Sequence, residues 1–432
     1  MESGFKKISI TFESVICLIL LFMPQILTQM TSIYTVETPD NIWYKYTSFD
    51  FSIIGLCIII LAIFKIRKTR SIRFFSFILL LFFVNLFFPY EDNVFSTGRF
   101  EMFLIMLQAA ALNYIVFSFD NISRESKPER AIMFIKIYFI LCFLSTLLRL
   151  SLGMSTDGRF GAIGLSVGGT GFFSVIILLY LIYCEKYSSL NVFVIFSALI
   201  SLILSGQRTC IFIFITLSIP YIFNIFFGTK QNNSNDNGSK KMQLLFLAMM
   251  GLGILLVLIL LLLVSTNIQL PGLSFVERVF DTVSDFFNGN LSNDGSVEGR
   301  WDSIEAGLSV WAENPLGIPN DFYSLQSRMT DFNYPTFPHC TALDLILLWT
   351  LPIAIFVFGY CIKLWLILIK NHDRFQWVIL FILIMSVIWG SPFLGSTQLF
   401  IELFFITLAV IRIKTKYHNV HFVLTLGGRQ HK

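Results

Sequence analysis

Apolar runs of about 20 residues follow one another along most of this chain, and they limit its possible folds more than any other feature. The hydrocarbon core of a bilayer is roughly 30 Å thick, so a helix needs about 20 apolar residues to cross it. Hydrophobic residues make up 55% of the 432 residues and charged residues only 13%, which is too little charge to cover a soluble globule. The sequence therefore predicts an all-α polytopic membrane protein.

Twelve runs have the length of a membrane span. They are residues 9–30, 50–66, 74–90, 100–119, 132–150, 165–184, 190–206, 209–227, 242–264, 341–369, 375–391 and 397–412. The first run follows Lys6 and Lys7 and has no small-residue cleavage site after it, so it predicts an uncleaved span. One boundary is open, because the short gap at 206–209 is also compatible with a bend in a single structure.

The distribution of lysine and arginine predicts the orientation, because cytoplasmic loops of membrane proteins are enriched in both. With a cytoplasmic N-terminus, the inner loops hold 23 of the 31 basic residues, and the C-terminus is cytoplasmic too. The other eight lie outside or near outer membrane ends, and seven are arginine: Lys45, Arg99, Arg149, Arg159, Arg208, Arg278, Arg300 and Arg328. This bias favours phosphate binding at the outer face. Pairing with outer carboxylates explains it as well.

Two long polar loops lie within what we treat as a single integral membrane domain, residues 1–432. Residues 228–241 are rich in Asn, Ser and Gly without apolar periodicity, which predicts a flexible cytoplasmic loop. Residues 265–344 form a large outer, periplasmic loop between spans 9 and 10. The total charge of +4 gives no indication of nucleic-acid binding. The seven cysteines lie mostly in apolar runs without metal-binding spacing, which predicts small core residues and no disulfide.

The large outer loop contains two short stretches with apolar residues at helical spacing. One covers residues 275–287, and Asn314-Pro315 ends the other. The apolar positions of the second are Trp301, Ile304, Leu308 and Trp311. Such amphipathic helices either lie on the membrane surface and roof a cavity, or form the core of a small cap.

Two outer turns combine arginine with small residues. Arg159 lies in a glycine-rich segment, Asp157 to Gly171, where glycine permits irregular backbone around a wet cavity or simply close helix packing. Arg208 lies in the turn Ser-Gly-Gln-Arg-Thr directly before a helix, where the free N–H groups of the helix start would add to an anion pocket. An arginine so close to hydrocarbon indicates function, unless it snorkels to lipid headgroups.

The most polar stretch of the outer loop is GRWDSIEAGLSVWAENPLG, residues 299–317. Arg300 stands at the expected start of the Trp301 helix, where the helix dipole makes a cation unfavourable. Asp302 or Glu298 can compensate it, and so can a ligand diphosphate. His339 is the only histidine expected on the outer side. Histidine titrates near neutral pH and can accept a proton from a sugar hydroxyl, although a lone histidine is more often structural.

These features together resemble the O-antigen polymerase and O-antigen ligase superfamily, membrane glycosyltransferases with a GT-C-like organisation. The resemblance rests on about twelve spans, the turn with Arg208, the run from Arg300-Trp301 to Asn314-Pro315-Leu316-Gly317 in a late outer loop, and His339 before a span. In that family the histidine is often followed by Asn, whereas Cys340 follows it here.

The resemblance implies an enzyme of the bacterial inner membrane whose active site faces the periplasm. Its donor would be a glycan on undecaprenyl diphosphate. Arg208 and Arg300 would bind the diphosphate, Arg159 would assist at donor or acceptor, and His339 would be the base. Further substrate-binding candidates are Arg278, Arg328, Trp301 and Asp302. If His339 is not the base, the candidates are Asp302, Glu305, Glu313 and Asp321. We expect no metal and no cofactor, because the outer loops have no Asp-x-Asp pattern or His/Cys cluster.

The expected function is a polymerase that transfers lipid-linked polysaccharide onto a newly flipped lipid-linked repeat unit. One alternative is a ligase that moves polymer onto lipid A core. Another is a flippase or secondary transporter, for which Glu402 in the last span is the main argument. Partners would be the undecaprenyl-diphosphate-linked oligosaccharide, membrane lipids and a chain-length regulator membrane protein.

Overall fold

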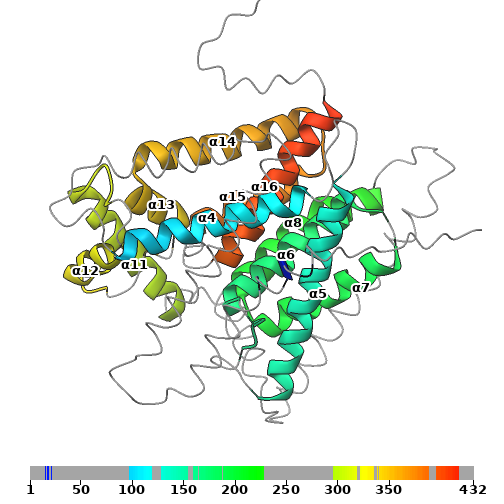
Figure 1. The fold of residues 1–432 in the computed structure, drawn as a ribbon, viewed down its shortest axis with the longest axis horizontal. Helices are drawn as coiled ribbons and strands as arrows, with labels where there is room; N and C mark the ends of the chain where they lie inside the picture. Colours follow the sequence, from blue (N-terminus) through cyan, green and yellow to red (C-terminus); the bar gives the residue numbers. More distant parts are fainter. Residues whose placement is uncertain are drawn as a thin grey trace, which may run out of the picture.

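The computed structural model of the chain describes residues 97–118, 128–153, 159–163, 165–186, 188–227, 295–318, 322–334, 338, 340–388 and 396–417, with Val15, Cys17, Leu18 and Leu21. Within this part the regular elements are eleven α-helices (Figure 1). They are α4 Thr97–Ser118, α5 Glu129–Ser151, α6 Val167–Cys184, α7 Ser189–Ser205, α8 Arg208–Phe227, α11 Gly295–Glu313, α12 Phe322–Asp331, α13 Thr341–Trp349, α14 Leu351–Lys370, α15 Gln376–Ile388 and α16 Ser396–Lys416. The predicted all-α class is confirmed for these residues.

Three of these helices, α5, α6 and α14, are long and apolar enough to cross a membrane. Large hydrophobic side chains also remain exposed on the outside of the bundle, among them Leu144 on α5, Phe212 on α8 and Leu366 on α14. Apolar surface of this extent needs lipid or a partner to cover it. The length and composition of the three helices indicate a membrane protein.

The predicted runs at 50–66, 74–90 and 242–264 lie outside the described residues, as does most of the run at 9–30. The loop at 228–241 and the predicted helix at 275–287 lie outside them too. The remaining runs coincide with described helices, with one exception described next.

The predicted span 341–369 is wrong as a single helix, because the structure breaks it at Thr350 into α13 and α14. Thr350 has φ 78° and ψ 147°, a conformation outside the helical region. Pro352 then stands in the first turn of α14, where its fixed φ and missing N–H cause no loss. The sequence signal of this break was the Thr-Leu-Pro order within a strongly apolar run.

The segment that follows α11 supplies the backbone partners that the break requires. The Ile318 N–H donates to the Leu347 carbonyl, and the Leu351 N–H donates to the Leu316 carbonyl at 3.4 Å. Gly317 lies between them with φ 96°, and a Cβ there would overlap the carbonyl oxygen of Ile346. Irregular backbone among apolar helices is stable only when other protein groups pair with it. The break therefore fixes the position of the outer segment.

Helix α6 is the centre of the bundle, since nearly all of its residues are buried. It packs against α5, α7, α8, α15 and α16, and a helix that is hydrophobic on every side suits this position. Phenylalanine rings fill the spaces between the helices. Phe172 of α6 stacks on Phe381 of α15 at 5.1 Å between ring centroids, and Phe117 of α4 stacks on Phe404 of α16 at 4.9 Å. Such pairs add to the packing energy of the buried area.

We expect Gly317→Ala to lower the stability of the purified protein by at least about 2 kcal/mol, because alanine disfavours a positive φ and its Cβ would overlap the Ile346 oxygen. Gly299→Ala is the matched control: it lies within α11, has no neighbouring atom within 4 Å, and should be neutral or stabilising by about 0.5–1 kcal/mol. Thermal unfolding in detergent measures both. Equal midpoints for the two variants would contradict the close approach at Gly317.

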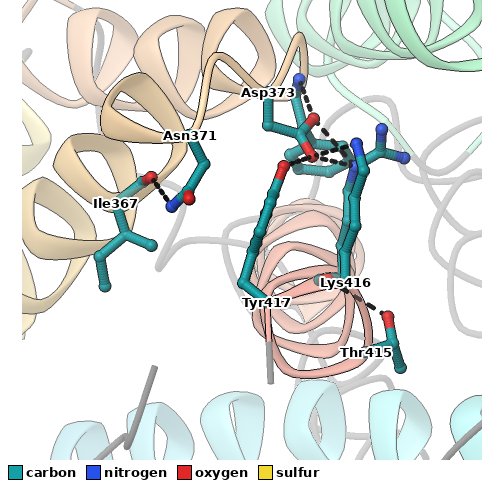
Figure 2. A network of polar contacts seen from close by, with 8 residues as sticks. Ile367, Asn371, Asp373, Thr415, Lys416 and Tyr417 are labelled. Carbon is teal, nitrogen blue, oxygen red and sulfur yellow. Dashed lines mark hydrogen bonds and ion pairs between the residues drawn. The ribbon is translucent and has the colours of Figure 1, made fainter. Parts of the chain in front are cut away.

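One end of the bundle is held by a buried carboxylate in the turn between α14 and α15. Asp373 accepts hydrogen bonds from Arg412 Nε at 2.9 Å to each oxygen, from Lys416 Nζ at 3.2 Å and from Tyr417 OH at 2.9 Å (Figure 2). The Phe375 N–H donates to the same carboxylate at 3.0 Å. These contacts tie the end of α16 to the α14–α15 turn.

A second polar network lies at the same end. Lys136 Nζ of α5 donates to Glu185 Oε2 at 3.1 Å and to Asn191 Oδ1 at 2.8 Å, and Tyr180 OH donates to Glu185 Oε1 at 2.6 Å. The Tyr180 ring also contacts the Phe375 ring, with centroids 6.0 Å apart, which connects this network to the turn at Asp373. The basic residues of both networks belong to loops or helix ends that the charge distribution predicts to be cytoplasmic.

Asp373 should make stability depend on pH. Burial alone would raise the pKa of its carboxyl, but hydrogen bonds from Arg412 and the Phe375 N–H outweigh burial and lower the pKa to about 2. Its stabilising contribution, about 2 kcal/mol, is present above pH 4 and is lost as the pH falls towards 2. We expect Asp373→Asn to lower the midpoint of thermal unfolding at pH 6. Below pH 3 the midpoints of the variant and the wild type should approach each other. The exposed Asp331→Asn is the control, and a constant difference across this range would refute the assignment.

Candidate functional site

Arg208 lies where α7 ends and α8 begins. The gap at 206–209 is a turn between two separate helices and not a bend within one structure. Gly206 ends α7 in the left-handed conformation with φ 57°, and α8 begins at Arg208. The turn packs closely on α6, since a Cβ at Gly171 would lie 2.9 Å from Gln207 Cβ and 3.1 Å from Ser205 Oγ. Arg208 is therefore placed in the first turn of α8, beside the positive end of its dipole, as the sequence predicted.

The segment with Arg159 is attached to the same turn. The Phe160 N–H donates to the Leu204 carbonyl at 2.9 Å. Two further backbone N–H groups of this irregular segment bond to side chains, Ala162 to Thr170 Oγ1 at 2.8 Å and Ile163 to Ser145 Oγ at 2.9 Å. Residues 159–163 are irregular, whereas Gly168, Gly169 and Gly171 lie buried within α6, which agrees with close helix packing as the role of these three glycines.

Arg300 of α11 reaches the start of α8 although 91 residues separate the two positions. Its Nη1 donates to Thr209 Oγ1 at 3.1 Å. The three segments that carry Arg159, Arg208 and Arg300 therefore meet at one end of the bundle, which we call the arginine end. The opposite end is the one held by Asp373, since α6 runs from Val167 beside the first to Tyr180 beside the second.

The predicted helix start at Arg300 is wrong, because α11 begins at Gly295, more than one turn earlier. The effect of a helix dipole falls off within the first turn, so the dipole of α11 has little effect on the charge of Arg300. The helix dipole that acts on Arg300 is that of α8, because Arg300 hydrogen-bonds to Thr209, the second residue of α8. Two arginine-bearing segments and a helix N-terminus thus create positive potential in one place, an arrangement that suits an anion.

The predicted apolar face of α11 is divided, because Ile304 and Trp311 pack against the bundle core while its other two residues face outwards. Trp301 and Leu308 are 69% and 46% exposed, whereas Ser303, Gly307 and Val310 are buried or in close contact with the bundle. The physical reason is the small size of Gly307: a Cβ there would lie 2.6 Å from Leu343 Cδ2 and 2.8 Å from Pro338 Cγ. Small residues let α11 approach α13 closely, which leaves Trp301 and Leu308 facing outwards as an apolar stripe.

The Asn-Pro-Leu-Gly motif forms a turn that ends α11. The Gly317 N–H donates to the Asn314 carbonyl at 2.8 Å, and Asn, Pro and Gly occupy the positions that a β-turn favours. Trp311 Nε1 donates to the Pro315 carbonyl at 3.1 Å. Arg328 of α12 donates to Asn314 Oδ1 at 3.3 Å, so this predicted substrate-binding residue contacts the turn. Helix α12 itself was not predicted.

Two predicted site residues, Arg278 and His339, lie outside the described residues, as does Asp321. The neighbours of His339 are described: Pro338 and Cys340 are both buried, and Pro338 packs against Gly307 of α11. Asp302 and Glu305 are exposed on α11, and Glu313 is exposed at its end. Pro338 thus lies close to α11.

Sequence reasoning missed one buried carboxylate near this region. Asp344 lies in the first turn of α13 and is fully buried. The signal was present, because Asp344 is the only acidic residue in the predicted run 341–369 and ionisable residues within spans are functional candidates by default. The helix N-terminus favours its negative charge.

The six described cysteines are free thiols, and all but Cys184 are buried. Burial raises the pKa of the Cys340 thiol, which makes it a weak nucleophile. Among the described residues, no group of three or more His, Cys, Asp or Glu side chains has the arrangement of a metal site.

No protein-family model matches this chain, and no curated protein sequence is significantly similar to it.

We expect Thr209→Val to weaken the attachment of α11 to the bundle, because valine keeps the shape of threonine but cannot accept the hydrogen bond from Arg300. A partly exposed hydrogen bond to a charged group stabilises by about 1 kcal/mol. Thermal unfolding of the purified protein measures the loss. Thr209→Ser retains the hydroxyl and should remain close to wild type, so an equal loss in both variants would contradict the contact.

Proposed function

We propose that this chain is a polysaccharide polymerase of the O-antigen polymerase and ligase type, a metal-independent glycosyltransferase with a lipid-diphosphate-linked donor. The observation that carries the proposal is the contact between Arg300 and Thr209, which unites the late polar loop with the turn at Arg208. Two arginines from segments far apart in sequence thus belong to one end of a helical bundle of membrane-protein character. The proposal places about twelve spans in a GT-C-like arrangement, with the arginine end in the periplasm.

A diphosphate leaving group suits the arginine end for two physical reasons. Guanidinium groups present paired N–H donors to phosphate oxygens and remain charged at any physiological pH. The start of α8 adds the positive end of a helix dipole at the same place. Charge that develops on the diphosphate as the glycosidic bond breaks would be stabilised by Arg208 and Arg300 without a metal ion. Arg159 would assist from the attached segment.

The carrier lipid requires an apolar surface beside the phosphate site. The apolar stripe, Trp301 and Leu308, faces outwards from α11 and begins next to Arg300. Tryptophan is favoured where membrane and water meet. The stripe therefore supports an α11 that lies at the membrane surface, with the isoprenoid chain or bilayer lipid against Trp301.

The transfer also needs a base that takes a proton from the acceptor hydroxyl. His339 is our first candidate, because its neighbour Pro338 packs against Gly307 of α11. Asp302 and Glu305 lie on the flank of α11 opposite Arg300 and are poorly placed for this role, whereas Asp344 is a buried carboxylate in the first turn of α13. A base within reach of the acceptor would contribute about 10²–10⁴ in rate.

The second candidate function belongs to a different class of protein, a transporter or flippase. One observation favours it. Glu402 lies within α16, one turn after Gln398. Gln398 in turn lies within 3.5 Å of where a Cβ of Gly169 would be, near the arginine end. An ionisable residue within a span is typical of transport pathways.

The experiment is complementation of a deletion strain, with the surface polysaccharide resolved by length on a gel. Arg208→Ala and Arg300→Ala should each abolish long chains while the protein still accumulates in the membrane. Lys414→Ala is the matched control, since Lys414 is exposed at the Asp373 end and should leave chain length unchanged. Normal chain length in both arginine variants would remove the diphosphate assignment.

The pattern of the deletion strain itself separates the functions. A lipid A core that carries a single repeat indicates loss of a polymerase. Polymer that remains on carrier lipid indicates loss of a ligase, and disappearance of all outward-facing repeats indicates loss of a flippase. The last pattern, together with failure of Glu402→Gln to complement, would replace the polymerase proposal by the transporter.

A further inference from the structure

A groove separates α11 from the C-terminal end of α12, on the flank of α11 that faces away from Arg300. Figure 1 shows the two helices side by side, next to α13. The groove has a volume of about 340 Å³, at the small end of the range of about 300–1,000 Å³ for small-molecule sites. Its lining consists of Asp302, Glu305, Ala306, Ser309, Phe332, Asn333 and Tyr334.

One wall of the groove is a polar face of α11. Asp302, Glu305 and Ser309 follow each other at intervals of three and four residues, so they line one side of the helix. The two carboxylates are hydrogen-bond acceptors, and the Ser309 hydroxyl, which donates to the Glu305 carbonyl at 3.0 Å, can still accept. Hydroxyl or ammonium donors of a ligand would form charge-assisted hydrogen bonds to this wall, which are stronger than neutral ones.

The other wall is a rigid aromatic turn. The N–H groups of Asn333 and Tyr334 donate to the carbonyls of Thr330 at 2.9 Å and Met329 at 3.0 Å, which is the pattern of a Schellman cap at the end of α12. Asn333 adopts the left-handed conformation that this cap requires, with φ 60°. The cap fixes the backbone that carries Phe332 and Tyr334 at the groove, which reduces the backbone entropy lost on binding.

We propose that this groove binds a sugar residue that carries no acidic group, either neutral or amino-bearing. A sugar ring has an apolar C–H face and an edge of hydroxyl donors. The aromatic wall matches the face and the carboxylate wall matches the edge. Among the residues that the structure describes, the lining contains two carboxylates and no basic side chain, so a uronic acid or another anionic sugar would be repelled. The groove thus selects glycans by charge.

The distance from the arginine end indicates which part of a glycan the groove holds. Arg300 and Ser309 lie on opposite flanks of α11, separated by the thickness of one helix, about 10–12 Å. The sugar in the groove is therefore remote from the bond that is made or broken. The assignment of this sugar to the acceptor repeat unit rests on the proposed function, whereas saccharide binding itself does not.

The test uses the full-length protein in nanodiscs on an array of neutral, amino-bearing and uronic-acid oligosaccharides. Wild type should bind neutral or amino glycans and not uronic ones. Glu305→Gln and Tyr334→Ala should each lower the affinity for the tightest-binding glycan at least tenfold, about 1.4 kcal/mol in binding free energy. Glu313→Gln is the matched control, an equal charge change on the same helix outside the groove, and should bind as wild type does.

Charge reversal tests the selectivity without relying on loss alone. The double variant Asp302→Lys with Glu305→Lys should gain binding to uronic-acid oligosaccharides, and its unfolding midpoint reports whether it folds. Absence of any neutral or amino glycan binding by wild type would overturn the proposal. So would a preference of wild type for uronic acids, or equal weakening in Glu313→Gln.

The experiments can refute glycan binding in the groove and the proposed polymerase function independently of each other. Arg300→Ala should lose long chains but retain glycan binding on the array, because Arg300 is not part of the groove. Glycan binding that depends on Glu305 and Tyr334 in a protein whose deletion leaves polymer length unchanged would refute only the proposed function. Long chains that require Arg300, with groove variants that bind glycans like wild type, would refute only the groove.

Discussion

Satisfaction of backbone hydrogen bonds among apolar helices is the constraint on which the position of the outer segment depends. The break at Thr350 interrupts the helical hydrogen bonds of a strongly apolar run, and the chain at Leu316 and Ile318 replaces part of them. Where water is scarce, only other protein groups can supply such hydrogen bonds. The same contact fixes the segment that directly follows α11, and it therefore helps to position the C-terminal end of that helix.

Small residues decide how closely the helices approach at the other contacts. Gly171 admits the side chain of Gln207, Gly307 admits Leu343 and Pro338, and Gly317 admits the carbonyl of Ile346. Each of these contacts connects the arginine end to the bundle. Close packing of this kind drives helix association in a membrane, where lipid tails are as apolar as leucine, and at Gly171 it brings α6 close to the turn at Gln207.

The two ends of the bundle differ in how their cations are held. At one end a fixed carboxylate, Asp373, neutralises Arg412 and Lys416, which makes that end a structural clamp. At the other, Arg300 donates to the neutral hydroxyl of Thr209 at the start of a helix, where the dipole adds to its positive charge. Ion pairs thus cross-link the Asp373 end. At the arginine end, positive charge from two segments gathers at a helix start, which is the physical argument for the diphosphate proposed there.

The sequence by itself determined the helical class, the apolar runs from α4 to α8 and the end of α11 at Asn314-Pro315, because run length and turn residues act locally. It also placed Arg208 at a helix start. Only the tertiary structure decided that Thr350 breaks a predicted span, that α11 begins at Gly295 and that Gly307 rather than Trp301 faces the bundle. Hydrophobic periodicity assumes that the apolar face is buried in protein. Beside a membrane that assumption fails, because shape selects the packed face and lipid can cover the other.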